Sequence, residues 1–178
     1  DGVLTVMAGH IAMPAYQAYF APETGHQIIP ASLSKELLGN LLREKLGFNG
    51  LIITDATPMV GFTSAMAREK AVPLSIENGC DMFLFNKDLA EDYQFMLDGY
   101  HGGILSEERL LAANRRILAL KAALRLHERS AQGTLVPDVG ALEILKCRQH
   151  MEWAKELADA SITLVKDTQQ LLPVHAEK

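Results

Sequence analysis

One carboxylate stands out because of the residues that precede it. Asp55 directly follows the apolar run Leu51–Thr54 and is itself followed by the small and turn-forming residues of Ala56–Met59. In barrels and open α/β sheets, ligands bind at the carboxyl ends of the strands, so we expect the Asp55 side chain to point into a site. A carboxylate there can act as a nucleophile, a general base or a metal ligand. The alternative is that Asp55 caps the following turn.

Three other polar residues are candidates for this site or for the loops around it. His10 occupies the equivalent place after the first run, where it can contribute to the same site or serve as a structural hydrogen-bonding residue. Asp81 precedes the third run, at the opposite end from the expected site, so we expect it to fix a loop. His26 lies in the loop between Pro22 and Pro30, which can flank the site.

The apolar runs and the segments between them predict how these side chains are positioned. The runs Val3–Met7, Leu51–Thr54 and Met82–Phe85 are apolar on consecutive positions, as is typical of strands covered on both faces in a parallel sheet. Helical patterns cover residues 35–46, 64–78, 88–100 and 106–124. Ser34 and Ser106 are the predicted N-caps of the first and the last of these helices, and Gly47 ends the first. Pro73 should break or restart the second helix. Strands that alternate with helices predict an α/β fold with right-handed crossovers.

The pattern changes after Leu126. Residues 129–137 resemble a linker, residues 141–160 follow a helical pattern, and Ile162–Val165 is a β-rich run. We therefore expect a connector that leads into a second structural unit.

Composition excludes several classes of protein and of partner. Of the 178 residues, 48% are hydrophobic and 22% charged, which is typical of a globular protein. The net charge is −5 and the sequence has no cluster of basic residues, which argues against binding to nucleic acid or to an anionic membrane. Cys80 and Cys147 lie far apart without metal-site spacing, which favours free thiols and a reducing, cytoplasmic compartment. The chain is too short for a complete (β/α)₈ barrel, which takes about 250 residues.

An ordered series of motifs resembles family 3 glycoside hydrolases. The matching segments are Met7–His10, Pro30–Ser34, Leu46–Asp55, Glu77–Met82, Ile104–Ser106, Arg116–Leu118 and Lys121. The tail, with Ala160–Asp167 and Leu171–Pro173, is similar to the entry to that family's second domain. The series covers most of the chain in the family's order and spacing.

The resemblance implies specific roles. Asp55 takes the place of the nucleophile in a retaining mechanism, in which the carboxylate forms a glycosyl-enzyme ester that water then opens. His10 and Met59 resemble residues of the β-N-acetylhexosaminidase branch and are expected to line the sugar subsite, although Ala56 replaces that branch's second aspartate. The expected substrate is a terminal β-linked N-acetylglucosaminide, with no metal or organic cofactor. The alternatives are a β-glucosidase or β-xylosidase of the same family and a non-catalytic carbohydrate-binding homologue.

The resemblance also implies a domain layout. Residues 1–128 correspond to the C-terminal part of a (β/α)₈ barrel, 129–160 to the interdomain linker and helix, and 161–178 to the start of an α/β sandwich domain. The branch's acid/base histidine lies in an Asp-x-His loop, and no such motif occurs in this chain. We therefore expect the isolated chain to be inactive, and to self-associate through the strand edges that barrel closure normally pairs.

Overall fold

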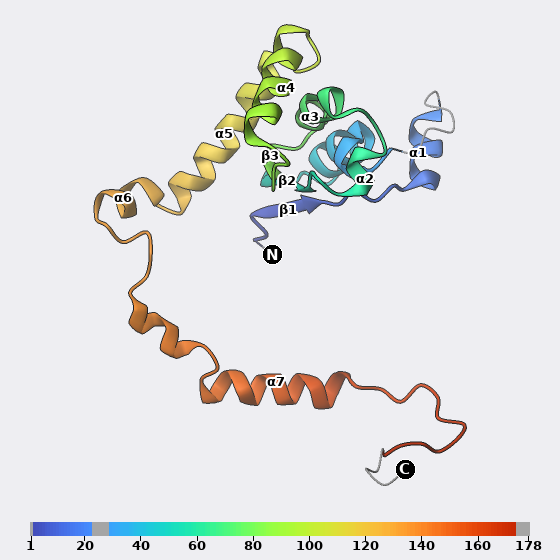
Figure 1. The fold of residues 1–178 in the computed structure, drawn as a ribbon, viewed down its shortest axis with the longest axis vertical. Helices are drawn as coiled ribbons and strands as arrows, with labels where there is room; N and C mark the ends of the chain where they lie inside the picture. Colours follow the sequence, from blue (N-terminus) through green and yellow to red (C-terminus); the bar gives the residue numbers. More distant parts are fainter. Residues whose placement is uncertain (1, 23–28, 174–178) are drawn as a thin grey trace. The chain divides into compact units, whose positions relative to one another are not determined.

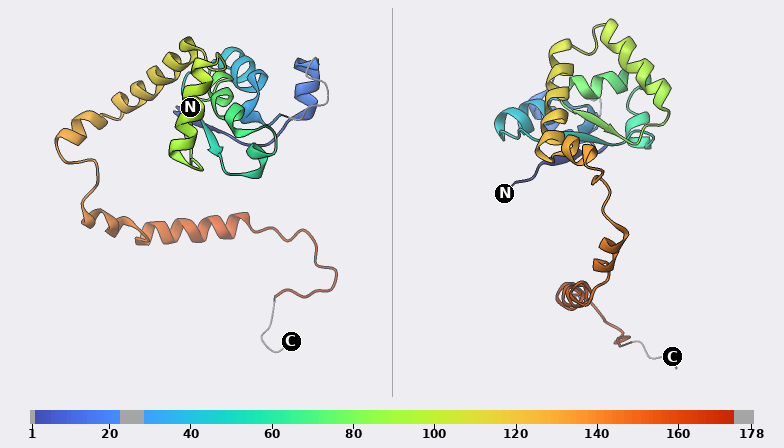
Figure 2. Two further views of the ribbon diagram at one scale, coloured as in Figure 1. Left: turned by 45° about the horizontal axis from the view of Figure 1, so that its top comes forward. Right: turned by 90° about the vertical axis from the view of Figure 1, so that its left-hand side faces the viewer.

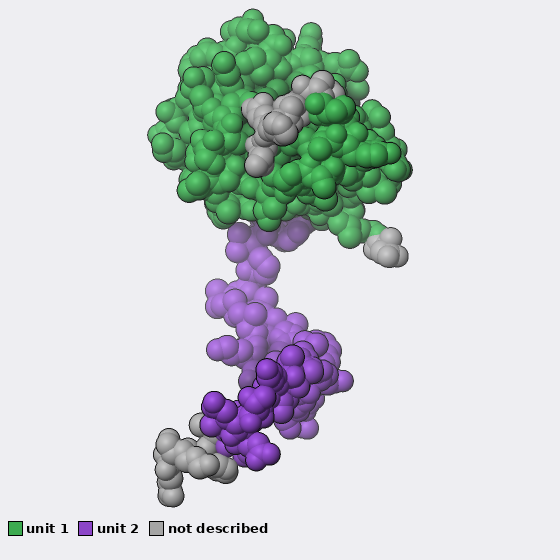
Figure 3. All heavy atoms as spheres, turned by 90° about the vertical axis from the view of Figure 1, so that its right-hand side faces the viewer, with its two compact units in different colours: residues 1–128 green, residues 129–178 purple. Residues whose placement is uncertain are grey.

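The chain divides into two compact units that are described separately. The structure is a computed structural model, and it describes residues 2–22 and 29–173. Unit 1 comprises residues 1–128 and unit 2 residues 129–178 (Figure 3).

Unit 1 is organised around a three-stranded parallel sheet in the order β1-β2-β3 (Figure 1). The strands are β1 (Thr5–Ala8), β2 (Leu51–Ala56) and β3 (Met82–Leu84). Thr5 pairs with Leu51 at one end of the β1–β2 ladder, and Ala56 pairs with Leu84 beyond a register shift in the β2–β3 ladder. The three predicted strands and their parallel arrangement are confirmed.

Helices separate the strands, as the sequence predicts. They are α1 (Pro14–Phe20), η2 (Ala31–Leu33), the π-helix η3 (Glu36–Lys45), α2 (Val60–Thr63), α3 (Arg68–Glu77), α4 (Leu89–His101) and α5 (Glu107–Ala123). Two predicted capping residues are confirmed: the Ser34 hydroxyl accepts from the Leu37 amide at 3.2 Å, and the Ser106 hydroxyl accepts from the Arg109 amide at 3.3 Å. Helix α1 stands apart from the other helices of unit 1 (Figure 2).

The expected interruption at Pro73 is wrong, because α3 runs through this residue. Proline has no amide hydrogen, so the helix loses one backbone hydrogen bond at this position. Packing offsets that loss, since α3 and α4 lie against each other and Pro73 is buried where they meet. Gly99 of α4 makes the close approach possible: a Cβ atom added there would lie 2.3 Å from the Cβ of Pro73.

The helices cover only one face of the sheet. A core cluster joins Ala8 and Ile52 to Leu38 of η3, Ile76 of α3 and Ala113 of α5. Side chains alternate between the two faces of a strand, so Met7 lies on the other face, and it is 49% exposed. The expectation that both faces are covered is therefore wrong at Met7, although Leu51 on the same face is buried. Closure of the sheet into a barrel would cover this face.

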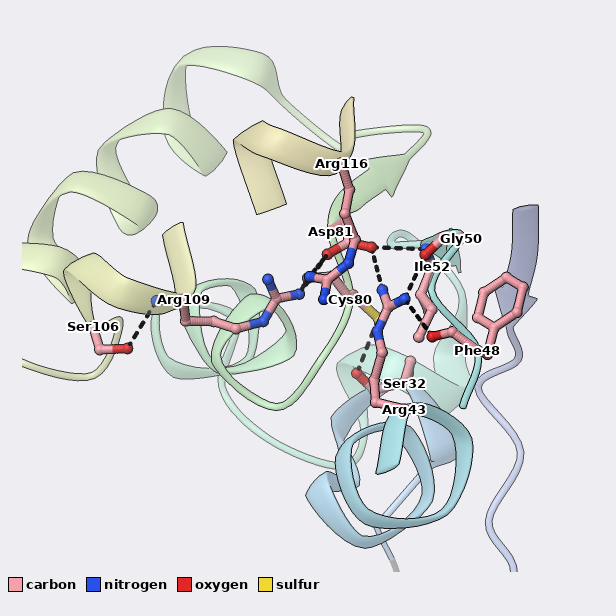
Figure 4. A network of polar contacts seen from close by, with 10 residues as sticks. All are labelled: Ser32, Arg43, Phe48, Gly50, Ile52, Cys80, Asp81, Ser106, Arg109 and Arg116. Carbon is pink, nitrogen blue, oxygen red and sulfur yellow. Dashed lines mark hydrogen bonds and ion pairs between the residues drawn. The ribbon is translucent and has the colours of Figure 1, made fainter. Parts of the chain in front are cut away.

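Asp81 fixes the loop before β3, as expected (Figure 4). Its carboxylate is buried and accepts the Ile52 amide at 2.9 Å, and it also pairs with three guanidinium groups. The distances are 2.7 Å to Arg109 and 3.4 Å to Arg116, and Arg43 makes a third, close contact. This Asp81 cluster (Arg43, Asp81, Arg109 and Arg116) links η3, β2 and α5 at the amino end of β3.

Burial around the Asp81 cluster shifts two pKa values. It lowers the pKa of the Arg43 guanidinium, against the opposing effect of the Asp81 charge. Burial also raises the pKa of the Cys80 thiol to about 12, and the neighbouring Asp81 charge acts in the same direction. Both cysteines are free, and Cys80 remains a protonated, buried thiol at neutral pH.

Unit 2 departs from the sequence prediction in two places. Helix α6 (Leu126–Ala131) leads into it from unit 1, followed by the 3₁₀ helix η4 (Val139–Ile144) and by α7 (Arg148–Ser161), which begins later than expected. The predicted strand Ile162–Val165 does not form. A strand needs a hydrogen-bonding partner, and the described residues of unit 2 contain no strand to pair with it. Across the described ranges, no helix is long and apolar enough to cross a membrane.

Replacing the central carboxylate of the Asp81 cluster should destabilise unit 1 strongly. The variant Asp81→Asn preserves the side-chain shape but leaves three guanidinium groups without their anion, and we expect a loss of about 3–5 kcal/mol in the free energy of unfolding. Urea unfolding followed by circular dichroism measures this loss. The matched control is Asp98→Asn, an exposed site on α4, which should change stability by less than about 0.5 kcal/mol. Equal stabilities of the two variants would contradict the role given to the cluster.

The two outer strands predict self-association of the isolated chain. Among the residues that the structure describes, β1 and β3 each pair only with β2, so each leaves one edge of backbone donors and acceptors without a partner strand. We expect the mass measured by light scattering to exceed that of a monomer and to rise with concentration. The edge variant Met7→Lys should lower that mass, because a charge on an edge strand opposes pairing. A well-folded, monodisperse monomer at high concentration would refute this prediction.

Candidate active site

Asp55 lies at the carboxyl end of the central strand β2, where the sequence places it. Its side chain is half-buried. One carboxylate oxygen, Oδ1, accepts the backbone amide of Ala56 at 2.8 Å, and Oδ2 has no hydrogen-bond or ion-pair partner among the described residues. A carboxylate that is to stay charged needs donors or cations nearby, and the described residues supply one backbone donor, the Ala56 amide. The arrangement therefore holds one oxygen in place and leaves the other available to react.

His10 follows β1 and reaches across to the residue after Asp55. Its Nδ1 lies 2.6 Å from the Ser32 hydroxyl and its Nε2 lies 3.1 Å from the Ala56 carbonyl oxygen. The side chain is buried, with its ring centroid 4.9 Å from that of Phe62. Both ring nitrogens thus have protein partners, which leaves neither free for a sugar hydroxyl in this geometry.

Met59 ends the turn that follows β2. Its amide donates to the Ala56 carbonyl at 3.1 Å, and its side chain is 46% exposed just before α2. The structure therefore brings the three predicted site residues together at Ala56: Asp55 precedes it, and His10 and Met59 both hydrogen-bond to its carbonyl oxygen.

Sequence reasoning missed the residues that join this turn to β3. Thr57 is fully buried, and its hydroxyl donates to the Phe85 carbonyl at 3.0 Å. Phe85 has a φ of 49°, in the left-handed region that non-glycine residues rarely adopt, and its side chain is 70% exposed at the same end of the sheet. The only available signal was its place at the end of the third apolar run. The contact with Thr57 links residues 28 positions apart and has no local signature.

No metal site accompanies these residues. Within residues 2–22 and 29–173, no group of three or more His, Cys, Asp or Glu side chains could hold an ion. His26, which the sequence places in a flanking loop, lies outside the described residues.

Comparison with known proteins gives one family for most of the chain. The model of the glycosyl hydrolase family 3 N-terminal domain matches residues 1–120. A beta-N-acetylglucosaminidase/beta-glucosidase of Cellulomonas fimi is 47% identical over 178 residues, which cover 99% of this chain and 31% of that protein. The chain thus spans about a third of the length of this relative.

Solved structures have the same fold. A beta-glucoside phosphorylase superposes with a TM-score of 0.85 at 46% identity, covering 99% of this chain and 32% of that one. A family 3 beta-N-acetylglucosaminidase from Paenibacillus sp. str. FPU-7 superposes with a TM-score of 0.70 at 26% identity, covering 93% of this chain and 30% of that one. These neighbours are barrel enzymes, so the parallel sheet and helices of unit 1 correspond to part of a barrel.

Proposed function

The chain belongs to glycoside hydrolase family 3, and from this premise we propose that the whole protein removes terminal β-linked N-acetylglucosamine with retention of configuration. Asp55 is the nucleophile in this proposal. The single observation that carries it is the Asp55 carboxylate at the carboxyl end of the central strand, with Oδ1 held by the Ala56 amide and Oδ2 open.

The proposed reaction has two steps. The free oxygen of Asp55 attacks the anomeric carbon while the bond to the leaving-group oxygen breaks, and an acid outside the described residues protonates that oxygen. Water then attacks the anomeric carbon and gives one proton to the conjugate base of that acid, while the ester bond to Asp55 breaks and the carboxylate is released. Two displacements at one carbon give net retention.

The N-acetylglucosaminide specificity rests on resemblance to one branch of the family. Met59 matches that branch, and the Paenibacillus neighbour carries the name beta-N-acetylglucosaminidase. The Cellulomonas relative is also named a beta-glucosidase, so a β-glucoside, or a β-xyloside, is the alternative substrate.

A second candidate reaction is favoured by the name of one neighbour. The structure at 46% identity is described as a beta-glucoside phosphorylase. In that reaction an oxygen of inorganic phosphate, instead of water, attacks the anomeric carbon of the ester on Asp55 and gives a sugar 1-phosphate. Supplying phosphate and analysing the product by ³¹P NMR distinguishes the two reactions, because hydrolysis yields only the free sugar.

Trapping the covalent intermediate tests the role of Asp55. The full-length protein, incubated with 5-fluoro-N-acetylglucosaminyl fluoride or 2-deoxy-2-fluoroglucosyl fluoride, should gain one sugar on the peptide that contains Asp55, as mass spectrometry would detect. The variant Asp55→Asn should lose at least about 10⁴-fold in kcat/KM, the scale of loss when a covalent nucleophile is removed.

The control for this experiment is again Asp98→Asn, which should retain full activity and form the adduct. An adduct on another residue would refute the role of Asp55. Retained sugar binding without any adduct would favour the non-catalytic alternative.

The isolated chain should show no measurable turnover. A nucleophile without the acid and most sugar contacts provides little transition-state stabilisation. The test is release of p-nitrophenol from p-nitrophenyl N-acetylglucosaminide by the purified 178-residue chain and by the full-length protein at equal concentration. Appreciable release by the chain would mean that these 178 residues contain a complete catalytic site.

A further inference from the structure

The side chains of Ser32 and His10 form a relay that ends on the backbone beside Asp55. The Ser32 hydroxyl contacts His10 Nδ1 at 2.6 Å, and His10 Nε2 contacts the Ala56 carbonyl at 3.1 Å. Ser32 is fully buried and His10 is 8% exposed, so bulk water does not compete for these contacts. The relay connects three segments that are distant in the sequence.

The hydrogen-bonding partners fix the tautomer of His10. A carbonyl oxygen can only accept, so Nε2 must carry the hydrogen that it donates to Ala56. In the neutral ring Nδ1 is then an acceptor, and the Ser32 hydroxyl donates to it. The ring therefore has no unused hydrogen-bonding group.

Several contacts hold the relay in place. The amide of Ser32 donates to the Gly9 carbonyl at 3.3 Å, which keeps Ser32 beside the strand end that carries His10. On the other side, a Cβ atom added to Gly61 would lie 2.5 Å from the His10 carbonyl oxygen and 2.9 Å from its Cβ. His10 consequently has little room to turn toward another partner.

The relay ends on the residue that holds the carboxylate. The Ala56 amide donates to Asp55 Oδ1 at 2.8 Å, and the carbonyl of the same residue accepts from His10. We propose that Ser32 and His10 are positioning residues that fix Ala56 and thereby aim the Asp55 carboxylate. This inference rests on the proposed function, because it takes Asp55 as the nucleophile. It assigns no contact with the sugar to His10 and replaces the subsite role expected from the sequence.

The experiment uses the full-length protein and two histidine variants that separate the two contacts. In His10→Gln the side-chain NH₂ can occupy the place of Nε2 and still donate to Ala56, whereas in His10→Asn the shorter amide reaches only the Ser32 side. The measured quantities are the rate of trapping by the fluoro-sugar and the inhibition constant of free N-acetylglucosamine. The control variant is His101→Asn, an exposed residue of α4.

A misplaced nucleophile should affect the rate and leave ground-state binding unchanged. We expect His10→Asn to lower the trapping rate about 10- to 100-fold, His10→Gln to restore most of that loss, and all inhibition constants to stay within about twofold. Ser32→Ala, a smaller change, should lower the rate about 3- to 10-fold. ¹⁵N NMR of histidine-labelled wild-type protein should show the Nε2–H tautomer at His10, a measurement that does not depend on whether a variant folds.

Other outcomes would overturn the inference. An inhibition constant that rises in the His10 variants while the trapping rate holds would make His10 a sugar ligand. Unchanged rates in both His10→Asn and Ser32→Ala, equal losses in the Asn and Gln variants, or an Nδ1–H tautomer would remove the positioning role. If the wild-type protein instead forms no adduct on Asp55, it is the proposed function that fails.

Discussion

The buried carboxylate of Asp81 is the interaction on which the rest of unit 1 depends. Its two oxygens accept from the Ile52 amide and from the three guanidinium groups of the Asp81 cluster, which come from η3 and α5. A single buried anion would be strongly unfavourable, so the arginines are required for it, and each arginine in turn depends on the anion. The cluster thereby joins the central strand to helices from both halves of the unit.

Different kinds of side chain gather at the two ends of the sheet. The Asp81 cluster lies at the amino end of β3, whereas Asp55, Thr57 and Phe85 gather at the carboxyl ends of the strands. This division is typical of barrel folds, in which one end provides stability and the other carries the chemistry. At the carboxyl end, neutral side chains join the strands through hydrogen bonds to backbone groups, such as the bond from the Thr57 hydroxyl to the Phe85 carbonyl. The side chains of His10 and Thr57 already hydrogen-bond to protein groups. Of these three described residues, only Asp55 has a side-chain oxygen, Oδ2, without a protein partner.

The sequence predicted what local patterns determine. Apolar runs located the three strands, and Ser34 and Ser106 located helix starts, because these signals lie within a few residues of the structure they specify. The errors have a common cause: the helix through Pro73 depends on Gly99, and a strand at Ile162–Val165 depends on a partner strand. The Asp81 cluster and the Ser32–His10–Ala56 relay also connect segments that are distant in the sequence, so no local sequence pattern predicts them. Only the loop-fixing role of Asp81 was predicted, from its place before a strand.

His10 shows that the position of a residue in the sequence does not determine its contacts. The sequence places it at a strand end near Asp55, and the structure does the same, yet both ring nitrogens hydrogen-bond to protein groups, those of Ser32 and Ala56. Sugar hydroxyl and acetamido groups need hydrogen-bond partners, because a buried polar group without one is costly. Two of the exposed side chains at this end of the sheet, those of Met59 and Phe85, offer apolar surface and no such partner. The proposed specificity for N-acetylglucosamine therefore requires polar groups other than His10, Met59 and Phe85, and the chain spans only about a third of its Cellulomonas relative.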